Sequence, residues 1–412
     1  MSVLRIRDFR LLWCAGVISG LGSWMLTIAI PMRVYLASRS LLAAGIVLTA
    51  QYAPPFLLAP AAGVLADRYD RRTLMAGANV VSAGAVALLL ASSHAYWITY
   101  LALAAESAGA VVFTPAMKAR VPAVVGTGPD LASAAALNAA TNAGLGLVGG
   151  PLGGVLVTFT GITPLIWADV ASYLVSAGLI LLTSRNARPD VAHLGLGGSR
   201  GAWAGVRAGW DEFRAGWNAL CAEPAVRALL PVNTLFLGAN ASLTALFIPF
   251  AIIRLGGARQ AGILLLALSA GYLIGAPLIR ALLATATPRY VLAGSLAVSA
   301  IGYSVMFGSA SLVQAMPAAF VLGLVGSTAL AGIQTTIQRL IPDGLLGRVS
   351  AVFTGAEAAA TLLGSVAGPV IAQLAGTFPA AVVASVLALA SAALAWPARR
   401  RPHPREPVHC DL

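Results

Sequence analysis

Charged residues are scarce in this sequence. They make up only 10% of its 412 residues, whereas soluble domains carry roughly 25%. A soluble chain of this length would need far more polar surface, so the composition argues strongly against a water-soluble enzyme. The hydrophobic content of 59% argues equally against intrinsic disorder, which requires low hydrophobicity.

Cysteine and lysine are also scarce. The three cysteines, Cys14, Cys221 and Cys410, form no C-x-x-C pair, and their spacing predicts neither a disulfide framework nor a metal site. We therefore expect no metal and no cofactor. Lys118 is the single lysine among 26 basic residues, and the net charge is +12. Such a charge is typical of nucleic-acid binding, but also of the basic loops of a membrane protein.

Long apolar runs dominate what is present. A membrane helix needs roughly 20 mostly apolar residues, and twelve such runs predict an all-α membrane protein with twelve transmembrane helices. The predicted spans are 10–32, 41–65, 73–92, 96–117, 131–158, 163–184, 227–252, 260–284, 289–309, 312–338, 348–375 and 377–396. The N-terminus lacks a cleavable signal pattern, so we expect the first run to be a retained helix.

One long polar break divides these runs into two sets of six. It predicts an N-terminal bundle over 1–184, a cytoplasmic linker over 185–226, a C-terminal bundle over 227–397 and a disordered cytoplasmic tail over 398–412. Apolar residues at helical spacing in the linker predict an amphipathic helix. It either lies on the membrane surface or packs under the bundles; the residues concerned are Trp203, Val206, Trp210, Phe213, Trp217 and Leu220.

The basic residues predict the orientation in the membrane. With the N-terminus inside, 22 of them fall on inner segments and four on outer segments, a strong positive-inside bias. We therefore expect a multi-pass protein of the cell (plasma or inner) membrane with both termini in the cytoplasm. The net positive charge is then explained by basic residues on the cytoplasmic segments, and we expect no nucleic-acid partner.

The two halves resemble each other at a shift of 218 residues. Arg71 falls on Arg289, the pair Gly150-Pro151 falls on Gly368-Pro369, and Arg120 falls within one residue of Arg339. Chance matching among apolar segments is the alternative. A duplicated unit of six helices predicts a substrate site near the middle of the bilayer, between the halves.

The most specific motif is GVLADRYDRR, between the second and third spans. It resembles the signature inner loop of the major facilitator superfamily through Gly63, Asp67, Arg68, Arg71 and Arg72. Its charges can form a breakable contact between halves, which we name the conformational latch. The alternative is an ordinary solvated turn.

A second motif, GLGLVGGPLGGVL, lies in the fifth span. Gly146, Gly150, Pro151 and Gly154 resemble the glycine-proline motif of exporters in this superfamily, although Val155 replaces its last glycine. The alternative is a generic small-residue face for helix packing. By resemblance the motif favours export over import.

Other stretches, among them PAMKARVP and IPDGLLGRVSAVF, resemble the macrolide-efflux and enterobactin-exporter branch of drug/proton antiporters. Members of that branch often carry an acid in the first helix where this chain has Ser23. The resemblance therefore leaves the position of a proton site open.

Three acids fall within predicted spans, namely Glu106, Glu357 and Asp169. Each costs roughly 2.5–3.5 kcal/mol to insert at a helix centre, and acids at such positions usually mark an ion or substrate path. We rank Glu106 first as a proton-coupling candidate, Glu357 second, and Asp169 third because it lies nearer the outer interface. A structural hydrogen-bonding role is the alternative for each.

Polar residues within the spans are candidates for lining a cavity. Helix–helix hydrogen bonding is the alternative for each of them. The candidates are Ser19, Ser23, Thr27, Asn233, Asn240, Gln334 and Gln338.

Together these patterns predict a secondary transporter with no catalytic residues. A literal G-x-G-x-x-G at 144–149 and a literal G-x-S-x-G at 197–201 lack the strand context that their enzymatic roles require. The favoured function is proton-coupled export of a small apolar or amphipathic molecule, such as a drug, antibiotic, siderophore or secondary metabolite. The alternative is an importer or symporter on the same fold. The expected partners are the lipid bilayer, the substrate and protons, and we expect a monomer.

Overall fold

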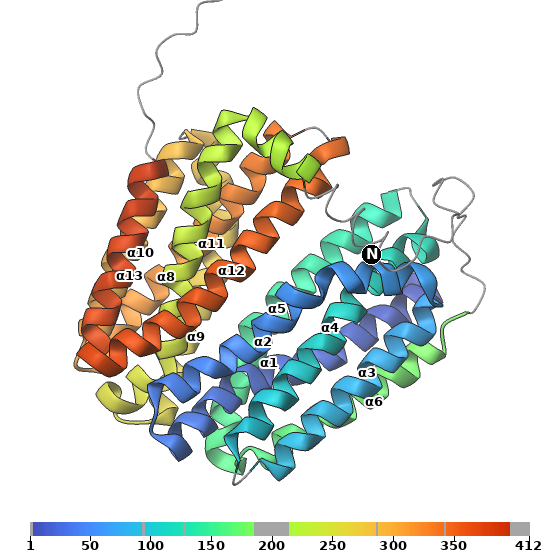
Figure 1. Cartoon of the computed structure of the whole chain (residues 1–412), viewed down its shortest axis with the longest axis horizontal. Helices are drawn as coiled ribbons and strands as arrows, with labels where there is room; N and C mark the ends of the chain where they lie inside the picture. Colours follow the sequence, from blue (N-terminus) through green and yellow to red (C-terminus); the bar gives the residue numbers. More distant parts are fainter. Residues whose placement is uncertain are drawn as a thin grey trace, which may run out of the picture.

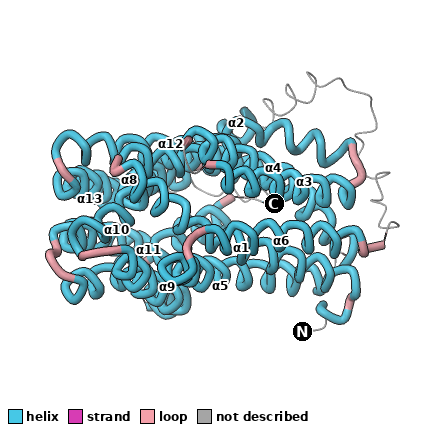
Figure 2. The backbone as a smooth tube through the Cα atoms, turned by 90° about the horizontal axis from the view of Figure 1, so that it is seen from below, coloured by secondary structure: helices cyan, strands magenta, loops and turns pink. Residues whose placement is uncertain are grey.

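The computed structural model describes residues 3–92, 95–126, 129–184, 214–285, 287–341 and 343–395. These ranges are almost entirely helical and contain no strand (Figure 2). The predicted all-α class is therefore confirmed. The tail, most of the linker and four of its six predicted apolar-face residues (Trp203, Val206, Trp210 and Phe213) lie outside the described residues.

Twelve long helices in the described ranges correspond one to one to the predicted spans. The first six, with the short 3-10 helices η1 (Val3–Arg5) and η2 (Leu88–Ala91), are α1 (Arg7–Ser38), α2 (Leu41–Arg68), α3 (Arg71–Ala87), α4 (Tyr96–Val125), α5 (Pro129–Thr160) and α6 (Thr163–Leu181). The other six are α8 (Pro224–Leu255), α9 (Ala258–Thr285), α10 (Pro288–Gly308), α11 (Leu312–Leu340), α12 (Asp343–Ala375) and α13 (Thr377–Ala395).

The helices are long and apolar enough to cross a membrane. Eleven helical stretches in the described ranges meet this condition, and α9 contributes a shorter apolar stretch, Arg259–Gly275. At 1.5 Å per residue, the 32 residues of α1 extend about 48 Å, well beyond a hydrocarbon core of about 30 Å. The chain is a multi-pass membrane protein.

The packing of the first six helices is repeated in the second six. In the first half α1 packs against α5 and α6, α3 against α4 and α6, and α2 against α4. In the second half α8 packs against α12 and α13, α10 against α11 and α13, and α9 against α11. Adding 218 to the first residue of α1 gives 225, next to the start of α8 at 224, and the same shift maps the start of α6 within four residues of the start of α13. The repeated packing supports a duplicated six-helix unit.

The two sets of helices lie on opposite sides of Figure 1. We name the end of the molecule where α1 begins and α6 ends the linker end, and the opposite end the far end. Near the far end, Thr49 of α2 and Ser365 of α12 share a hydrogen bond of 3.0 Å between their hydroxyls. A Cβ on Gly45 would lie 2.5 Å from Pro369 Cγ, so the backbone of α2 packs closely on α12.

A further contact between the halves joins α5 to α9, also toward the far end. A Cβ on Gly262 of α9 would meet Val155 Cγ2 of α5 at 3.4 Å, and a Cβ on Gly154 would lie 3.7 Å from the Gly262 Cα. From these contacts the ribbons of α2 and α12 diverge toward the linker end (Figure 1). Small residues thus allow close approach of the halves at both contacts.

Charged side chains join the linker ends of four helices in the first half. Arg71 of α3 donates to the carbonyl of Ala119 in α4 at 3.1 Å, and Arg72 donates to the carbonyls of Ile180 and Leu181 at the end of α6. Arg120 of α4 is buried and donates to the carbonyl of Ser184, whose N–H donates to Asp8 of α1 at 3.0 Å. The carbonyls of Leu181 and Ser184 lie at and just beyond the end of α6, where a helix leaves carbonyls without a partner, and the arginine side chains bind them.

Asp70 caps the start of α3, outside the membrane-spanning part. Its carboxylate accepts hydrogen bonds from the N–H and the hydroxyl of Thr73 at 3.0 and 2.8 Å. Desolvation alone would raise the pKa of Asp70, but the hydrogen bonds from Thr73 and the positive charge of Arg120 lower the pKa overall. The charged carboxylate therefore stabilises the folded state.

We expect Asp70→Ala to lower the free energy of unfolding by about 1 kcal/mol at pH 7, because an N-cap is lost. Since the folded-state pKa is lowered, this contribution is present above the ordinary pKa of about 3.9 and is lost as the pH falls below it. Thermal unfolding of the purified protein at pH 7 and in acid measures both effects. Asp70→Asn is the control, because asparagine also caps; equal losses for the two variants would contradict the capping role.

Candidate functional site

A hydrogen-bonded polar cluster joins three helices of the first half. The Tyr173 hydroxyl of α6 donates to Glu106 Oε1 of α4 at 2.9 Å. The hydroxyl of Ser23 in α1 lies 2.9 Å from the same tyrosine oxygen. Tyr173 is buried, while Glu106 is partly exposed. One tyrosine therefore links the first-ranked proton candidate to the position where the resembling exporters often carry an acid.

Asp169 extends this cluster. It lies one helical turn before Tyr173 on α6 and is fully buried. Ser172 donates to Asp169 Oδ1 at 3.1 Å, and Asp169 Oδ2 has no hydrogen-bond partner among the described residues. A Cβ on Gly22 of α1 would lie 3.0 Å from the carboxyl carbon, so only glycine leaves room there for the aspartate. A buried acid with an unpaired oxygen is costly and is typical of a functional group.

Glu357 belongs to a separate pair in the second half. Asn233 Nδ2 of α8 donates to Glu357 Oε1 of α12 at 2.7 Å. Asn233 is buried and Glu357 partly exposed. Two residues selected from the sequence for different roles are thus direct partners.

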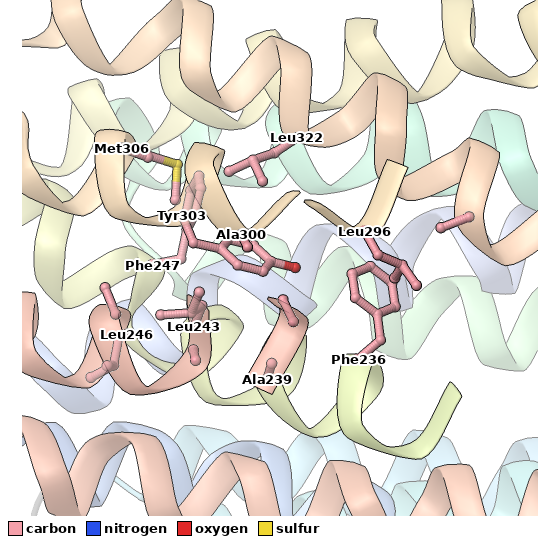
Figure 3. Packing of buried hydrophobic residues seen from close by; sticks show 14 of the residues in the cluster. Phe236, Ala239, Leu243, Leu246, Phe247, Leu296, Ala300, Tyr303, Met306 and Leu322 are labelled. Atoms are coloured by element: carbon pink, nitrogen blue, oxygen red, sulfur yellow. The ribbon is translucent and has the colours of Figure 1, made fainter. Parts of the chain in front are cut away.

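A small cavity of about 90 Å³ lies within the second half, between α8, α9, α10 and α11. Its apolar wall includes Leu243, Phe247, Met306 and Leu322, which Figure 3 shows gathered around Tyr303. Its polar groups come from Asn240, Thr244, Tyr272 and Tyr303. The Tyr303 hydroxyl donates to Asn240 Oδ1 at 3.2 Å.

The other predicted cavity-lining residues differ in their surroundings. The hydroxyls of Ser19 and Thr27 donate to the carbonyls four residues before them in α1, so these bonds lie within one helix and are not the helix–helix bonds considered as their alternative. The Ser23 hydroxyl lies within hydrogen-bond distance of both the Ser19 carbonyl, at 3.0 Å, and the Tyr173 oxygen of α6, at 2.9 Å. Gln334 is exposed, and the side chain of Gln338 lies outside the described residues. Asn240 is the member of the set that lines the cavity described above.

The two motifs are described only in part. The side chains of Gly63, Asp67 and Arg68 lie outside the described residues, although α2 extends to Arg68. Their neighbours Arg71 and Arg72 bind carbonyls within the first half, as given above. The role of these five residues as a conformational latch stays a prediction.

The helix-five glycines face two neighbouring helices. A Cβ on Gly146 would meet the Trp24 ring of α1 at 3.3 Å. A Cβ on Gly150 would meet both Ile28 of α1 and Leu265 of α9 at 3.4 Å. Together with Gly154, these glycines pack α5 against α1 of the first half and against α9 of the second half. The side chain of Pro151 lies outside the described residues.

Tyr173 is the main residue that the sequence analysis missed. A signal was available, because Asp169, Ser172, Tyr173 and Ser176 recur at spacings of three and four on α6, and such spacing places them on one face. Ser176 continues this face and accepts a hydrogen bond from Asn79 of α3 at 2.7 Å. Among the described residues, no three His, Cys, Asp or Glu side chains gather so as to hold a metal ion.

Two repeated six-helix sets are the fold of major facilitator superfamily transporters, and the family model that matches this chain belongs to that superfamily. Solved structures with this fold include the nucleoside transporter NupG, with a TM-score of 0.71 and 12% identity over 94% of this chain and 98% of that one. A bacterial homologue of the lysosomal transporter Spinster, in an inward-facing and unoccupied conformation, has a TM-score of 0.69 and 15% identity over 94% and 95%.

Within this class, the chain belongs to the family described as transmembrane secretion effectors, whose model matches residues 1–406. It is 24% identical over 179 residues to the uncharacterized transporter YfiS of Bacillus subtilis, which is 43% of this chain and 42% of that protein. It is 29% identical over 121 residues to macrolide efflux protein A of Streptococcus pyogenes, 28% of this chain and 30% of that one. These matches span less than half of either relative. The chain is a membrane-embedded transporter.

Proposed function

We propose that this transporter exports a small apolar or amphipathic molecule in exchange for protons. The observation that carries the proposal is the cluster of Glu106, Tyr173, Ser23 and Asp169, in which two carboxyl groups lie within the membrane-spanning part of the first half. Acids at such positions are expensive and typically mark proton or ion paths. Tyr173 offers a hydroxyl through which a proton can pass between α4 and α1.

The proposed transport cycle rocks the two halves about a site between them. The contacts of α2 with α12 and of α5 with α9 lie toward the far end, so this is the end at which the halves are closed. Binding of a proton at Glu106 would change the cluster that links α1, α4 and α6. Proton binding shifts the balance between the two orientations of the halves only if the protonated cluster is more stable in one orientation than in the other.

The direction of transport rests on similarity. The macrolide efflux protein of Streptococcus pyogenes and the glycine-proline motif of α5 favour export. An importer or symporter is the second candidate, and a solved relative in fold favours it: the fucose:proton symporter of E. coli has a TM-score of 0.55 and 15% identity over 94% of this chain and 97% of that one. Deletion of an exporter raises the substrate concentration in the cell, whereas deletion of an importer lowers it.

We expect Glu106→Gln to abolish proton-driven transport. In everted membrane vesicles, an acid-inside pH gradient should drive uptake of a radiolabelled macrolide by the wild type. The variant should lose this uptake at least tenfold, a change of about 1.4 kcal/mol or more, and should retain substrate exchange without a gradient, since glutamine keeps the shape but cannot carry the proton.

Two further variants locate the effect. Tyr173→Phe removes the hydroxyl between Glu106 and Ser23, so we expect slower but still gradient-dependent uptake. Glu357→Gln is the matched substitution in the second half and should leave coupling intact. Undiminished coupling in Glu106→Gln, or its loss in Glu357→Gln instead, would contradict the assignment.

A further inference from the structure

The cavity between α8, α9, α10 and α11 has a chemistry of its own. Among the described residues that line it, none carries a charged side chain, so these residues offer nothing to balance a ligand charge. Its polar groups are two tyrosine hydroxyls, one amide and one threonine hydroxyl, set in an otherwise apolar wall. This combination of an apolar surface with a few placed polar groups is typical of small-molecule sites.

The polar groups of the cavity are not all engaged. Tyr303 is buried and donates to Asn240 Oδ1, and the Thr244 hydroxyl donates to the carbonyl of Asn240 at 2.8 Å. The Asn240 Nδ2 group and the Tyr272 hydroxyl have no hydrogen-bond partner among the described residues. Both are donors, so the cavity is suited to an oxygen that accepts hydrogen bonds.

The size of the cavity limits its occupant. An apolar cavity of about 150 Å³ holds benzene, and this one has about 90 Å³. It therefore accepts a group smaller than a benzene ring, such as a short branched alkyl group next to a carbonyl or ether oxygen. Thr244 is exposed and lies at the cavity, which leaves space there for the remainder of a larger molecule.

We propose that this cavity is a subsite for a compact, neutral group that carries an acceptor oxygen, such as a ketone, ester or ether. The Asn240 amide and the Tyr272 hydroxyl donate to that oxygen, and Phe247, Met306 and Leu322 contact the alkyl part. The subsite rests on the proposed function for its role in transport, since it names a chemical feature of the exported molecule. The first half supplies the carboxyl groups, and the second half binds the neutral group.

The experiment measures protection of an introduced thiol. Thr244→Cys is made in the full chain with Cys14, Cys221 and Cys410 replaced by serine, and its labelling by N-ethylmaleimide is timed. We expect propanone, which is smaller than benzene, to slow this labelling at least threefold, and 2-methylpropene, which has the same shape but lacks the oxygen, to have no effect. Thr114→Cys on exposed α4 surface is the control for general solvent effects and should show no protection.

Two variants test the donors separately. Tyr272→Phe removes a single oxygen and should raise the ketone concentration needed for half protection about two- to tenfold. Asn240→Leu should abolish protection. Equal protection by ketone and hydrocarbon, no protection by either, or unchanged protection in Tyr272→Phe would overturn the subsite. Because labelling requires no gradient and no transport, its failure is distinguishable from a failure of the proposed export.

Discussion

Cross-linking Thr49→Cys to Ser365→Cys is expected to stop transport almost completely. The two hydroxyls lie 3.0 Å apart on α2 and α12, and a disulfide requires Cβ atoms about 3.5–4.5 Å apart, which small side-chain rotations provide. If the halves must separate at the far end in each cycle, a covalent link there holds the transporter in one arrangement. Uptake into vesicles should fall by more than about tenfold after oxidation and should recover with reductant.

The matched control is a cross-link within one half. Ser304 of α10 and Ser385 of α13 have hydroxyls 2.8 Å apart, so Ser304→Cys with Ser385→Cys forms a similar disulfide between helices that move together. It should leave transport unchanged. Both pairs are made without the native cysteines, and loss of free thiols confirms each link. Full transport by the linked Thr49/Ser365 pair would show that the halves do not separate at this contact.

Gly323→Ala is expected to prevent correct packing of the second half. A Cβ at this position of α11 would lie 2.8 Å from the backbone nitrogen of Tyr272 and closer still to the carbonyl of Leu268. Gly271 of α9 faces the backbone of α11 in the same way, with a Cβ 2.9 Å from the nitrogen of Leu324. Since backbone cannot rotate away as a side chain can, we expect a loss of about 3 kcal/mol.

The measurement is the yield of monodisperse protein and its thermal unfolding temperature in detergent. Gly294→Ala is the control, because a Cβ at that position of α10 meets nothing within 4 Å. The control should keep the yield and unfolding temperature of the wild type. A Gly323→Ala protein as stable as the control would show that α9 and α11 can move apart without cost.

The proton-coupling candidates were only partly predictable. The cost of an acid in hydrocarbon identifies Glu106, Glu357 and Asp169 from sequence, because it depends on residue type and position in a span. The position of Asp169 in its span predicts a place nearer the outer interface; the structure adds that its side chain is fully buried, one turn from Tyr173. The link from Glu106 to Tyr173 spans 67 positions in sequence, and no local pattern specifies which helices meet.

The glycine motifs, too, were predictable from the sequence only in part. Gly146, Gly150 and Gly154 stand out by their spacing and by their resemblance to a known motif. Gly271 and Gly275 are also four apart, but only the structure shows that they and Gly323 form the closer contact, between α9 and α11. Spacing tells which residues share a face of a helix. It does not tell which helix packs there.

The sequence by itself determined the membrane class, the twelve helices and the repeat, because the hydrocarbon core demands long apolar helices whose backbone bonds are internal. Only the tertiary structure decided that Glu106, Tyr173, Ser23 and Asp169 share one cluster, that Asn233 binds Glu357, and that Asn240 lines a neutral cavity. These pairings depend on how the helices cross and rotate against one another, and the shapes of many side chains at once set that geometry. The scarcity of charged residues predicts that the chain lies in a membrane. The packing of its helices determines which of the few polar side chains meet and what they can bind.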